Sequence, residues 1–326
     1  MAGFSRTVLS LAAALIGLIV AARCESASAQ TVDYPNRKIT FIVGFAPGGG
    51  IDVFARSVAQ QLAEQFGYQI VVENRPGAAS NIAAKVVSTA PPDGYTLLVT
   101  GNSFAINQTL SKDLTYSVEE LRAVAFPARD SHALAVNADS GAHTLAEFIV
   151  MAKDKPVSAA VGGSSSHIVA DYVLKVMAKV QATSVPFQSG LPAMNALLGH
   201  QVHILAGPVS EVFAQLTAGK VRALAVSGPK RALALPDVPT LTEAGFPGVA
   251  INGWIGFLAP AQTPTDICAK LNGTINAIVA KPSFNERLRN LGYEPTTMAF
   301  ADTAPFLKDS IDVWRRMILA TGLTTE

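Results

Sequence analysis

The chain has 326 residues, with 25 Lys and Arg against 24 Asp and Glu, and 49% of its residues are hydrophobic. This balance of charge argues against nucleic acid or an anionic membrane surface as the main partner. The length exceeds what one core usually organises, so we expect two domains.

The first residues have the order of a secretory signal peptide. Arg6 precedes an apolar run from Val8 to Ala22, and Ala27-Ser28-Ala29 supplies a cleavage site, so we expect export and cleavage after Ala29. The run is shorter than the roughly 20 residues that span a bilayer. Cys24 lies where a lipoprotein cysteine could lie, but the charged residue before it does not fit such a site. Cleavage would leave Cys268 and therefore no internal disulfide.

Short β-rich runs alternate with helical patterns along nearly the whole chain. This alternation predicts the α/β class, in which helices cover both faces of parallel sheets. The pattern restarts after about residue 131, and the proline-rich segment from Pro229 to Pro247 is interpreted as a return connection. The expected strands are Ile39–Val43, Gln69–Glu73, Tyr95–Thr100, Ala133–Val136, Val157–Val161, 182–187, 201–205, 222–226 and Trp254–Leu258. The expected helices include those that carry Phe54 to Leu62, Ile82 and Val86, Ile168 to Val176, and Phe306 to Leu319, with one opened by a capping box of Thr144 and Glu147.

Two strand-to-helix turns, Pro47–Gly50 and Gly162–Ser166, place small residues immediately before a helix. The first turn of a helix leaves backbone N–H groups unpaired, and glycine lets a ligand approach them, so such a terminus attracts anions. In an open α/β sheet these turns lie at the carboxyl ends of strands, where ligands usually bind. Either turn taken singly could instead serve only tight packing.

The common nucleotide-binding motifs do not fit the first turn. Gly44 and Gly49 have the spacing of a phosphate-binding P-loop, but Gly50 and Ile51 occupy the positions of its lysine and hydroxyl residue. The dinucleotide motif also fails, because Val53 stands where the third glycine belongs. We therefore expect no nucleotide cofactor.

Asp52 follows the glycines in the first turn of the expected helix. Its negative charge suits the positive end of the helix dipole, and it can accept hydrogen bonds from nearby N–H groups. A carboxylate there would compete with an anionic ligand for the same donors. We favour a role in shaping the loop over direct contact with a ligand, and leave both open.

Catalysis has weak support in the sequence. His167 with Ser164 and Ser165 could form a nucleophile and base, but the G-x-S-x-G elbow is missing, and a base beside its nucleophile rarely points back at it. Hydroxyl and imidazole donors fit better as hydrogen-bond partners of an oxyanion. His200 and His203 are three apart in an expected strand, so they would face opposite sides and could not share a metal. We predict no catalytic residue and no metal ligand, with a secreted serine hydrolase as a remote alternative.

Three aromatic residues, Phe45, Phe187 and Trp254, are candidates for the walls of a cleft or, equally, for the core. Cys268 follows Ile267 in an apolar helix, and such a cysteine is more often buried filler than a nucleophile. These residues therefore support no chemistry by themselves.

A set of ordered blocks over the mature chain resembles the Bug family of extracytoplasmic solute receptors, the binding proteins of tripartite tricarboxylate transporters. The matching blocks are Tyr34-Pro35-x-Arg37, Phe45 to Gly50 with Asp52, Val72 to Arg75 with Gly77-Ala78, Pro92 to Leu98, Gly163-Ser164-Ser165-x-His167, Val185 to Phe187, Gly219-Lys220-x-Arg222 to Ala225, Leu235 to Thr240, and Glu243-Ala244-Gly245.

The resemblance implies a type II periplasmic-binding-protein fold, in which two doubly wound α/β lobes close on a ligand in the cleft between them. After removal of 1–29, residues 30–130 with 254–326 would form one lobe and 131–253 the other. The protein would be a periplasmic monomer, without enzymatic activity or cofactor, that passes a small organic carboxylate to membrane transporter subunits. A sensor of the same fold that signals to a membrane kinase is the alternative. The ligand-binding residues implied are Phe45, Ala46, Gly48, Gly49, Gly50, Ile51, Asp52, Asn102, Ser103, Gly163, Ser164, Ser165, His167 and Phe187.

Three departures from the family pattern bear on the ligand. Ile51 replaces a usual Thr or Ser and removes a hydroxyl donor. Gln188 replaces a frequent Lys, which lowers the positive charge available to a polyanion. Ala206-Gly207 replaces a frequent Phe-Asp pair, which removes a partner for an ammonium group. We therefore expect a less charged, aromatic or apolar carboxylate instead of a tricarboxylate or an amino acid.

Overall fold

The computed structural model describes residues 34–247 and 250–324, and the residues from Arg37 onward form one compact unit. The expected signal peptide, its cleavage site and Cys24 lie outside the described residues. Within the described residues, no helix has a stretch long and apolar enough to cross a bilayer.

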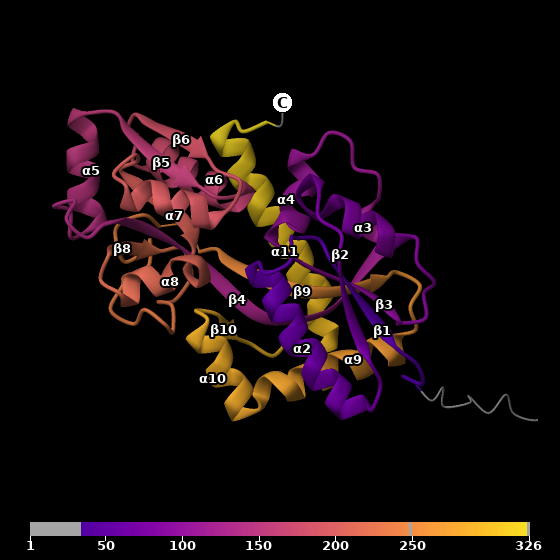
Figure 1. The fold of residues 1–326 in the computed structure, drawn as a ribbon. Coiled ribbons are helices and arrows are strands. Elements are labelled where there is room, and N and C mark those ends of the chain that lie inside the picture. The colour runs from indigo at the N-terminus through magenta and orange to yellow at the C-terminus, as the bar shows by residue number, and fades with distance from the viewer. Residues whose placement is uncertain (1–33, 248–249, 325–326) are drawn as a thin grey trace, which may run out of the picture. The chain divides into compact units, whose positions relative to one another are not determined.

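The described strands form one twisted sheet in the order β2-β1-β3-β9-β4-β7-β5-β6, and β8 and β10 also pair with β4. The strands β1, β2 and β3 run parallel, as do β5, β6 and β7, while β9 and β4 run antiparallel to their neighbours (Figure 1). The strands are β1 (Ile39–Val43), β2 (Ile70–Asn74), β3 (Thr96–Gly101), β4 (Leu121–Asn137), β5 (Val157–Val161), β6 (Ala182–Pro186), β7 (Ile204–Pro208), β8 (Val221–Val226), β9 (Asn252–Pro260) and β10 (Glu294–Pro295).

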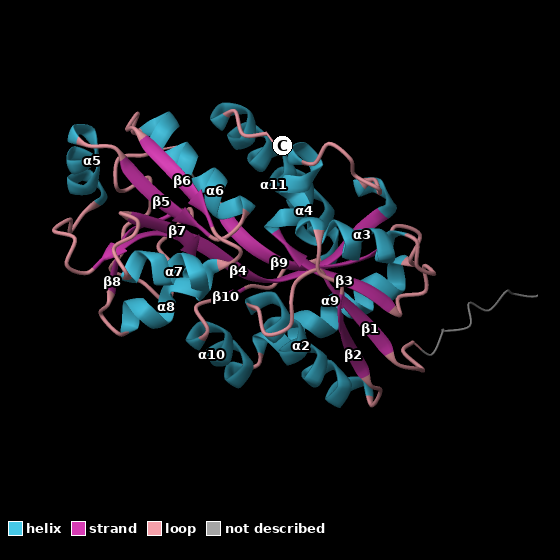
Figure 2. Ribbon diagram, turned by 45° about the horizontal axis from the view of Figure 1, so that its top comes forward, coloured by secondary structure: helices cyan, strands magenta, loops and turns pink. Residues whose placement is uncertain are grey.

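Helices lie on both sides of the strands (Figure 2). The helices are α2 (Gly50–Phe66), α3 (Asn81–Ser88), α4 (Asn102–Leu110), α5 (Leu145–Asp154), α6 (Ser164–Asp171), α7 (Gly190–Leu198), α8 (Val209–Thr217), α9 (Thr265–Ala280), α10 (Pro282–Asn290) and α11 (Phe300–Thr321), with 3-10 turns η1 (Ala78–Ser80) and η2 (Val118–Glu120) and a π-helical turn η3 (Tyr172–Met177) after α6. The predicted α/β class is therefore confirmed.

Local signals in the sequence set several helix ends. Gly67 ends α2 in the left-handed conformation, at φ 73°, which costs a glycine little. The predicted capping box opens α5, because Glu147 N–H donates to Thr144 Oγ1 and the Glu147 carboxylate accepts from His143 N–H. The expected connection between Pro229 and Pro247 contains no named helix or strand.

The strand β4 is much longer than the expected Ala133–Val136, and this prediction was wrong in its extent. Its residues up to Ser131 pair with β9, whereas those from His132 onward pair with β7 and β8. Register shifts interrupt the pairing with β9 between Ala123 and Ala128, so the residues do not follow a simple alternation. The alternation of apolar and polar residues that usually predicts a strand therefore could not reveal the first part of β4.

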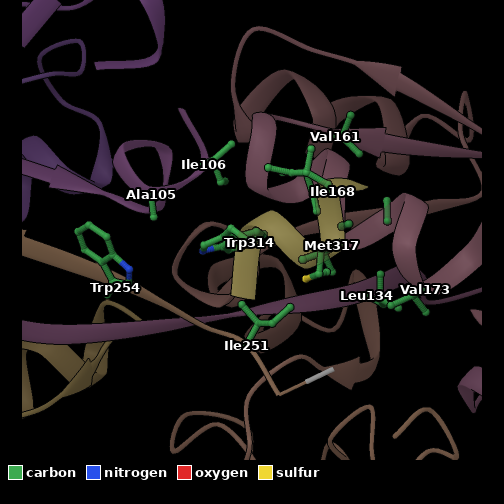
Figure 3. Packing of buried hydrophobic residues seen from close by; sticks show 14 of the residues in the cluster. Ala105, Ile106, Leu134, Val161, Ile168, Val173, Ile251, Trp254, Trp314 and Met317 are labelled. Atoms are coloured by element: carbon green, nitrogen blue, oxygen red, sulfur yellow. The ribbon is translucent and has the colours of Figure 1, made fainter. Parts of the chain in front are cut away.

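A large apolar cluster packs between the strands and the helices α4, α6 and α11 (Figure 3). Trp254 on β9 is 2% exposed, lies edge-on to Phe126 at 5.0 Å between ring centroids, and donates from Nε1 to Ser310 Oγ at 2.8 Å. Trp314 on α11 is likewise buried. Trp254 is thus a core residue whose polar atom is paired, as buried indoles usually are.

The two histidines expected in a strand lie elsewhere. His200 has a positive φ of 54° in the turn after α7, where its Nε2 lies near Asn137 and Asp139. His203 lies just before β7 and accepts from Ser158 N–H. The strand expected at 201–205 exists as β7, but its bounds were wrong, because the turn takes up the first residues and the strand begins at Ile204.

Candidate functional site

The first predicted turn connects β1 to α2, and its residues from Ala46 to Gly50 are exposed. Gly49 is the N-cap of α2 and offers no side-chain cap to the helix. Gly48 has a φ of 80°, a left-handed conformation that favours glycine. The start of α2 therefore presents backbone N–H groups to the exterior, as the sequence predicted.

Asp52 points back into this turn. It is 2% exposed and accepts from Gly48 N–H at 2.8 Å, from Arg56 Nε at 3.0 Å and from Asn74 Nδ2 at 2.8 Å. Burial raises the pKa of Asp52, but the hydrogen bonds from Arg56, Gly48 and Asn74 outweigh burial and hold it below its usual value. This geometry supports the loop-shaping interpretation, since the carboxylate already has its donors.

Asn102 and Ser103 begin α4, directly after β3, and lie near the first turn. Asn102 Oδ1 accepts from Trp254 N–H at 3.1 Å, which fixes the side chain against β9. A Cβ on Gly101 would lie 3.1 Å from Ile51 Cδ1, so α4 and α2 begin side by side. Ser103 Oγ is buried and has no hydrogen-bond partner among the described residues.

The second predicted turn connects β5 to α6. Gly163 is the N-cap of α6 and supplies no side-chain cap, and Ser164 and Ser165 in the first helical turn are partly exposed. A Cβ on Gly162 would lie 2.5 Å from the backbone nitrogen of Gly190, so the starts of α6 and α7 touch through glycine backbones. This terminus, like that of α2, has no side-chain cap.

The side chains of Ser165 and His167 have separate partners. Ser165 Oγ lies 2.9 Å from Nε2 of His132, whereas His167 Nε2 lies 3.5 Å from the carboxylate of Asp171. Burial raises the pKa of Asp171, but hydrogen bonds from His167 and Lys175 and one from Ser184 lower it to about 2. His167 and Ser165 do not form the dyad that a hydrolase would need.

The aromatic candidates Phe45 and Phe187 are each partly exposed beside a turn. The Phe45 carbonyl accepts from Asn74 Nδ2, and Phe187 N–H donates to the Val161 carbonyl. Phe45 thus follows β1 and leads into the first turn, whereas Phe187 follows β6 and leads toward α7, beside the end of β5. Both rings remain candidates for contact with a ligand.

A chain of contacts links the two turns, and the sequence analysis missed the residues that form it. A Cβ on Gly50 would lie 2.5 Å from the Tyr293 hydroxyl, and a Cβ on the preceding residue, Gly292, would lie 2.8 Å from Ser210 Cα at the start of α8. The carboxylate of the next residue, Glu211, packs directly against Gly190, which touches the second turn. Tyr293 lies just before β10, and Ser210 and Glu211 lie on α8, in segments without a glycine-rich turn.

Asp130 on β4 lies beside this contact chain. It accepts from Ser210 N–H at 3.2 Å and from Ser210 Oγ at 2.5 Å. Burial raises the pKa of Asp130 to about 8, and the bonds from Ser210 offset only part of that rise. Asp130 and His132 interrupt the apolar run from Ala123 to Val136, and this interruption is the sequence signal that could have identified them as candidate functional residues.

Comparison with known proteins places this geometry in a family. Residues 54–323 match the model of the tripartite tricarboxylate transporter family receptor. This chain belongs to that receptor family. The resemblance to Bug receptors is therefore confirmed, and the receptor is similar to the periplasmic binding protein BugD, with 30% identity and a TM-score of 0.78 over 90% of this chain and 100% of BugD.

Two further solved structures with similar folds carry organic acids. A Rhodopseudomonas palustris protein solved with adipate is 31% identical to the receptor, with a TM-score of 0.81 over 89% of this chain and 99% of that one. MatC from Rhodopseudomonas palustris, solved with bound malate, is 30% identical, with a TM-score of 0.75 over 87% and 100% of the two chains. The predicted type II periplasmic-binding-protein fold is confirmed by these neighbours.

Two cavities of the receptor lie away from both turns. One of about 180 Å³ lies between Arg129, Phe306 and Trp314, and one of about 460 Å³ lies between the start of α5, Arg222 and the segment around Val238. Neither includes a residue of the first or second turn. Among residues 34–247 and 250–324, no group of three His, Cys, Asp or Glu residues is placed to hold a metal.

Proposed function

We propose that the receptor captures a small carboxylate-bearing metabolite between the first turn and the second turn, and delivers it to a transporter of the tripartite tricarboxylate type. The observation that carries this proposal is the pair of helix starts at Gly49 and Gly163, both without a side-chain cap and linked by one chain of contacts. Uncapped helix starts bind anions through unpaired N–H groups. The neighbours solved with adipate and malate support a carboxylate as the anion.

The proposed lobes are residues 30–130 with 254–326, and residues 131–253. The change of partner along β4, from β9 at Ser131 to β7 and β8 at His132, supports a boundary there, and the start of β9 at Asn252 supports the second. A ligand that contacts both lobes favours their closed arrangement by its differential affinity. The closed form would then be the one that the transporter recognises.

The proposed ligand carries one carboxylate and an apolar or aromatic body. Ile51 brings no hydroxyl group, and Gln188 brings no positive charge. These two features oppose a polyanion, while the backbone N–H groups of the turns suffice for a single carboxylate.

Export to the periplasm is part of the same proposal. Cleavage after Ala29 would release a monomer that begins at Gln30 and contains Cys268 as its thiol. Intact-mass measurement of protein recovered from the periplasm tests this step. A protein that retains Cys24 with an attached lipid would contradict it.

The binding proposal is tested with ligand pairs that differ in charge alone. Isothermal titration would compare hexanoate with hexanamide and benzoate with benzamide, and would include adipate and malate. We expect micromolar binding, about −8 kcal/mol, for a carboxylate and none for its amide. Equal binding of acid and amide, or binding of neutral sugars alone, would contradict the anion site. Tighter binding of adipate than of hexanoate would contradict the preference for one charge.

The contribution of the second turn can be tested separately from the fold. Ser164→Ala and Ser165→Ala each remove a hydroxyl at the start of α6, and we expect each to weaken carboxylate binding about 3- to 30-fold. Ser140→Ala, in the turn before α5, is a control that changes a hydroxyl far from both turns. Unchanged affinity in both α6 variants would place the carboxylate elsewhere.

A further inference from the structure

His132 is a buried histidine at the point where β4 changes its pairing partner. It is 1% exposed, and its backbone is held on both sides, because its N–H donates to Ser227 Oγ at 3.0 Å and its carbonyl accepts from Ser227 N–H at 2.8 Å. Ser227 Oγ also donates to the Ile251 carbonyl at 2.8 Å. The backbone of His132 is therefore fixed where β4 changes partner.

The two ring nitrogens of His132 differ in their surroundings. Nε2 lies 2.9 Å from Ser165 Oγ, whereas Nδ1 is buried and has no hydrogen-bond partner among the described residues. The ring also lies edge-on to Trp314, at 6.3 Å between centroids. Trp314 belongs to the apolar cluster and is labelled in Figure 3. Burial lowers the pKa of His132 to about 4, so the ring is neutral at pH 7 and carries one N–H.

The position of that single proton decides what Ser165 can offer a ligand. If the proton is on Nδ1, a buried N–H is left unpaired and the bare Nε2 takes the only hydrogen of the Ser165 hydroxyl. If the proton is on Nε2, the ring donates to Ser165 Oγ, and the hydroxyl hydrogen is free to point outward. Unpaired buried N–H groups are rarer in proteins than unpaired acceptors, which favours the second arrangement.

We propose that His132 is a positioning residue of the carboxylate site: as the Nε2–H tautomer it donates to Ser165 Oγ and turns the Ser165 hydroxyl into a donor toward the ligand. The inference rests on the proposed function, because it takes the ligand to be an anion at the start of α6. It adds a residue from β4 that neither glycine-rich turn contains. A hydroxyl whose hydrogen points toward the ligand favours an acceptor, such as a carboxylate oxygen, over an N–H group at that position.

The tautomer can be measured without any ligand. Long-range ¹H–¹⁵N correlation spectra of histidine-labelled protein at pH 7.5 distinguish a ring nitrogen that bears a proton from a bare one. The His132 signals are identified by their loss in His132→Gln. We expect Nε2 to have the shift of a protonated nitrogen and Nδ1 that of a bare one. The reverse pattern, or an average of the two tautomers, would overturn the inference.

Binding measurements test the link to Ser165. The side-chain amide nitrogen of glutamine can replace Nε2 of histidine, whereas that of asparagine corresponds to Nδ1. Using hexanoate, benzoate and adipate as probes, we expect His132→Asn to weaken binding about 3- to 30-fold. His132→Gln should restore affinity to within about threefold of the wild type. His143→Gln, an exposed histidine before α5, is the matched control.

A double-mutant cycle separates positioning from a general effect on folding. In a Ser165→Ala background, we expect His132→Asn to cause no further loss of affinity, because the hydroxyl it orients is absent. Equal losses in both backgrounds would overturn the inference and leave His132 a structural residue. Wild-type protein that binds none of the acids would refute the proposed function itself. Wild-type protein that binds them, with His132→Asn unaffected, would refute this inference alone.

Discussion

The backbones of Gly162 and Gly190 touch where the second turn meets the start of α7. A Cβ on Gly162 would lie 2.5 Å from Gly190 N and 2.7 Å from Gly190 Cα. Backbone atoms cannot move aside as the end of a flexible side chain can, so a glycine at position 162 is a requirement of packing. This contact holds two helix starts together.

We predict that Gly162→Ala destabilises the protein by about 3 kcal/mol, because the added methyl group overpacks a rigid contact. Gly163→Ala is the matched control, since nothing lies within 4 Å of its Cβ position and its φ of 169° is extended backbone open to any residue. Urea unfolding of both variants gives the comparison. Equal losses of unfolding free energy would contradict the close contact.

Asp52 holds the first turn in place, so replacing it should destabilise the protein. Asp52→Asn keeps the size of the side chain but removes charge and one acceptor from a buried cluster, so we expect a loss of about 2 kcal/mol in unfolding free energy. Asp113→Asn, at an exposed position, should change stability by less than about 0.5 kcal/mol.

The acid dependence of the same variant follows from the lowered pKa of Asp52. The folded state binds this proton less readily than the unfolded state, so the stabilisation is complete above the ordinary value of 3.8 and is lost as pH falls through the lower folded pKa. The difference between wild type and Asp52→Asn in urea titrations should therefore shrink below pH 4. A difference that grows in acid would have the wrong sign.

The lowered pKa of His132 predicts a second pH range, above that of Asp52, in which the protein loses stability as the pH falls. Its pKa falls from 6.5 to about 4 on burial, so the unfolded chain takes up a proton that the folded chain refuses. Stability is complete above pH 6.5 and declines as pH falls toward 4, by about 3 kcal/mol in all. Urea titrations from pH 7.5 to 4 should show a flatter curve for His132→Gln than for His143→Gln. Superimposable slopes would contradict a neutral buried imidazole.

Cys268 predicts slow thiol chemistry in the folded protein. It is fully buried on α9, and burial raises its pKa to about 11, so thiolate is scarce and shielded at pH 7.5. We expect iodoacetamide to label it at least about 100-fold more slowly in buffer than in denaturing urea. Rapid labelling under native conditions would show that α9 opens. Free glutathione, labelled with iodoacetamide in both solutions, is the control for any effect of urea on the reaction itself.

The sequence located most of the turns and helices because their signals are local. The glycines before α2 and α6, the capping box at Thr144 and the glycine at 67 act within a few residues of their own position. These signals placed the β1–α2 and β5–α6 turns of the candidate site correctly at helix starts. The same reasoning also anticipated that Asp52 shapes its own loop.

The sequence alone determined the α/β class and the two glycine-rich helix starts, because hydrophobic periodicity and glycine act on neighbouring residues. Only the tertiary structure decided how these parts meet: that β4 is one long strand, that Tyr293 and Ser210 connect the turns, and that Ser165 faces His132 while His167 faces Asp171. Each of these contacts joins segments far apart in the chain or depends on the rotation of a helix about its axis. Such relations arise from packing of the whole chain, which no short stretch of sequence encodes.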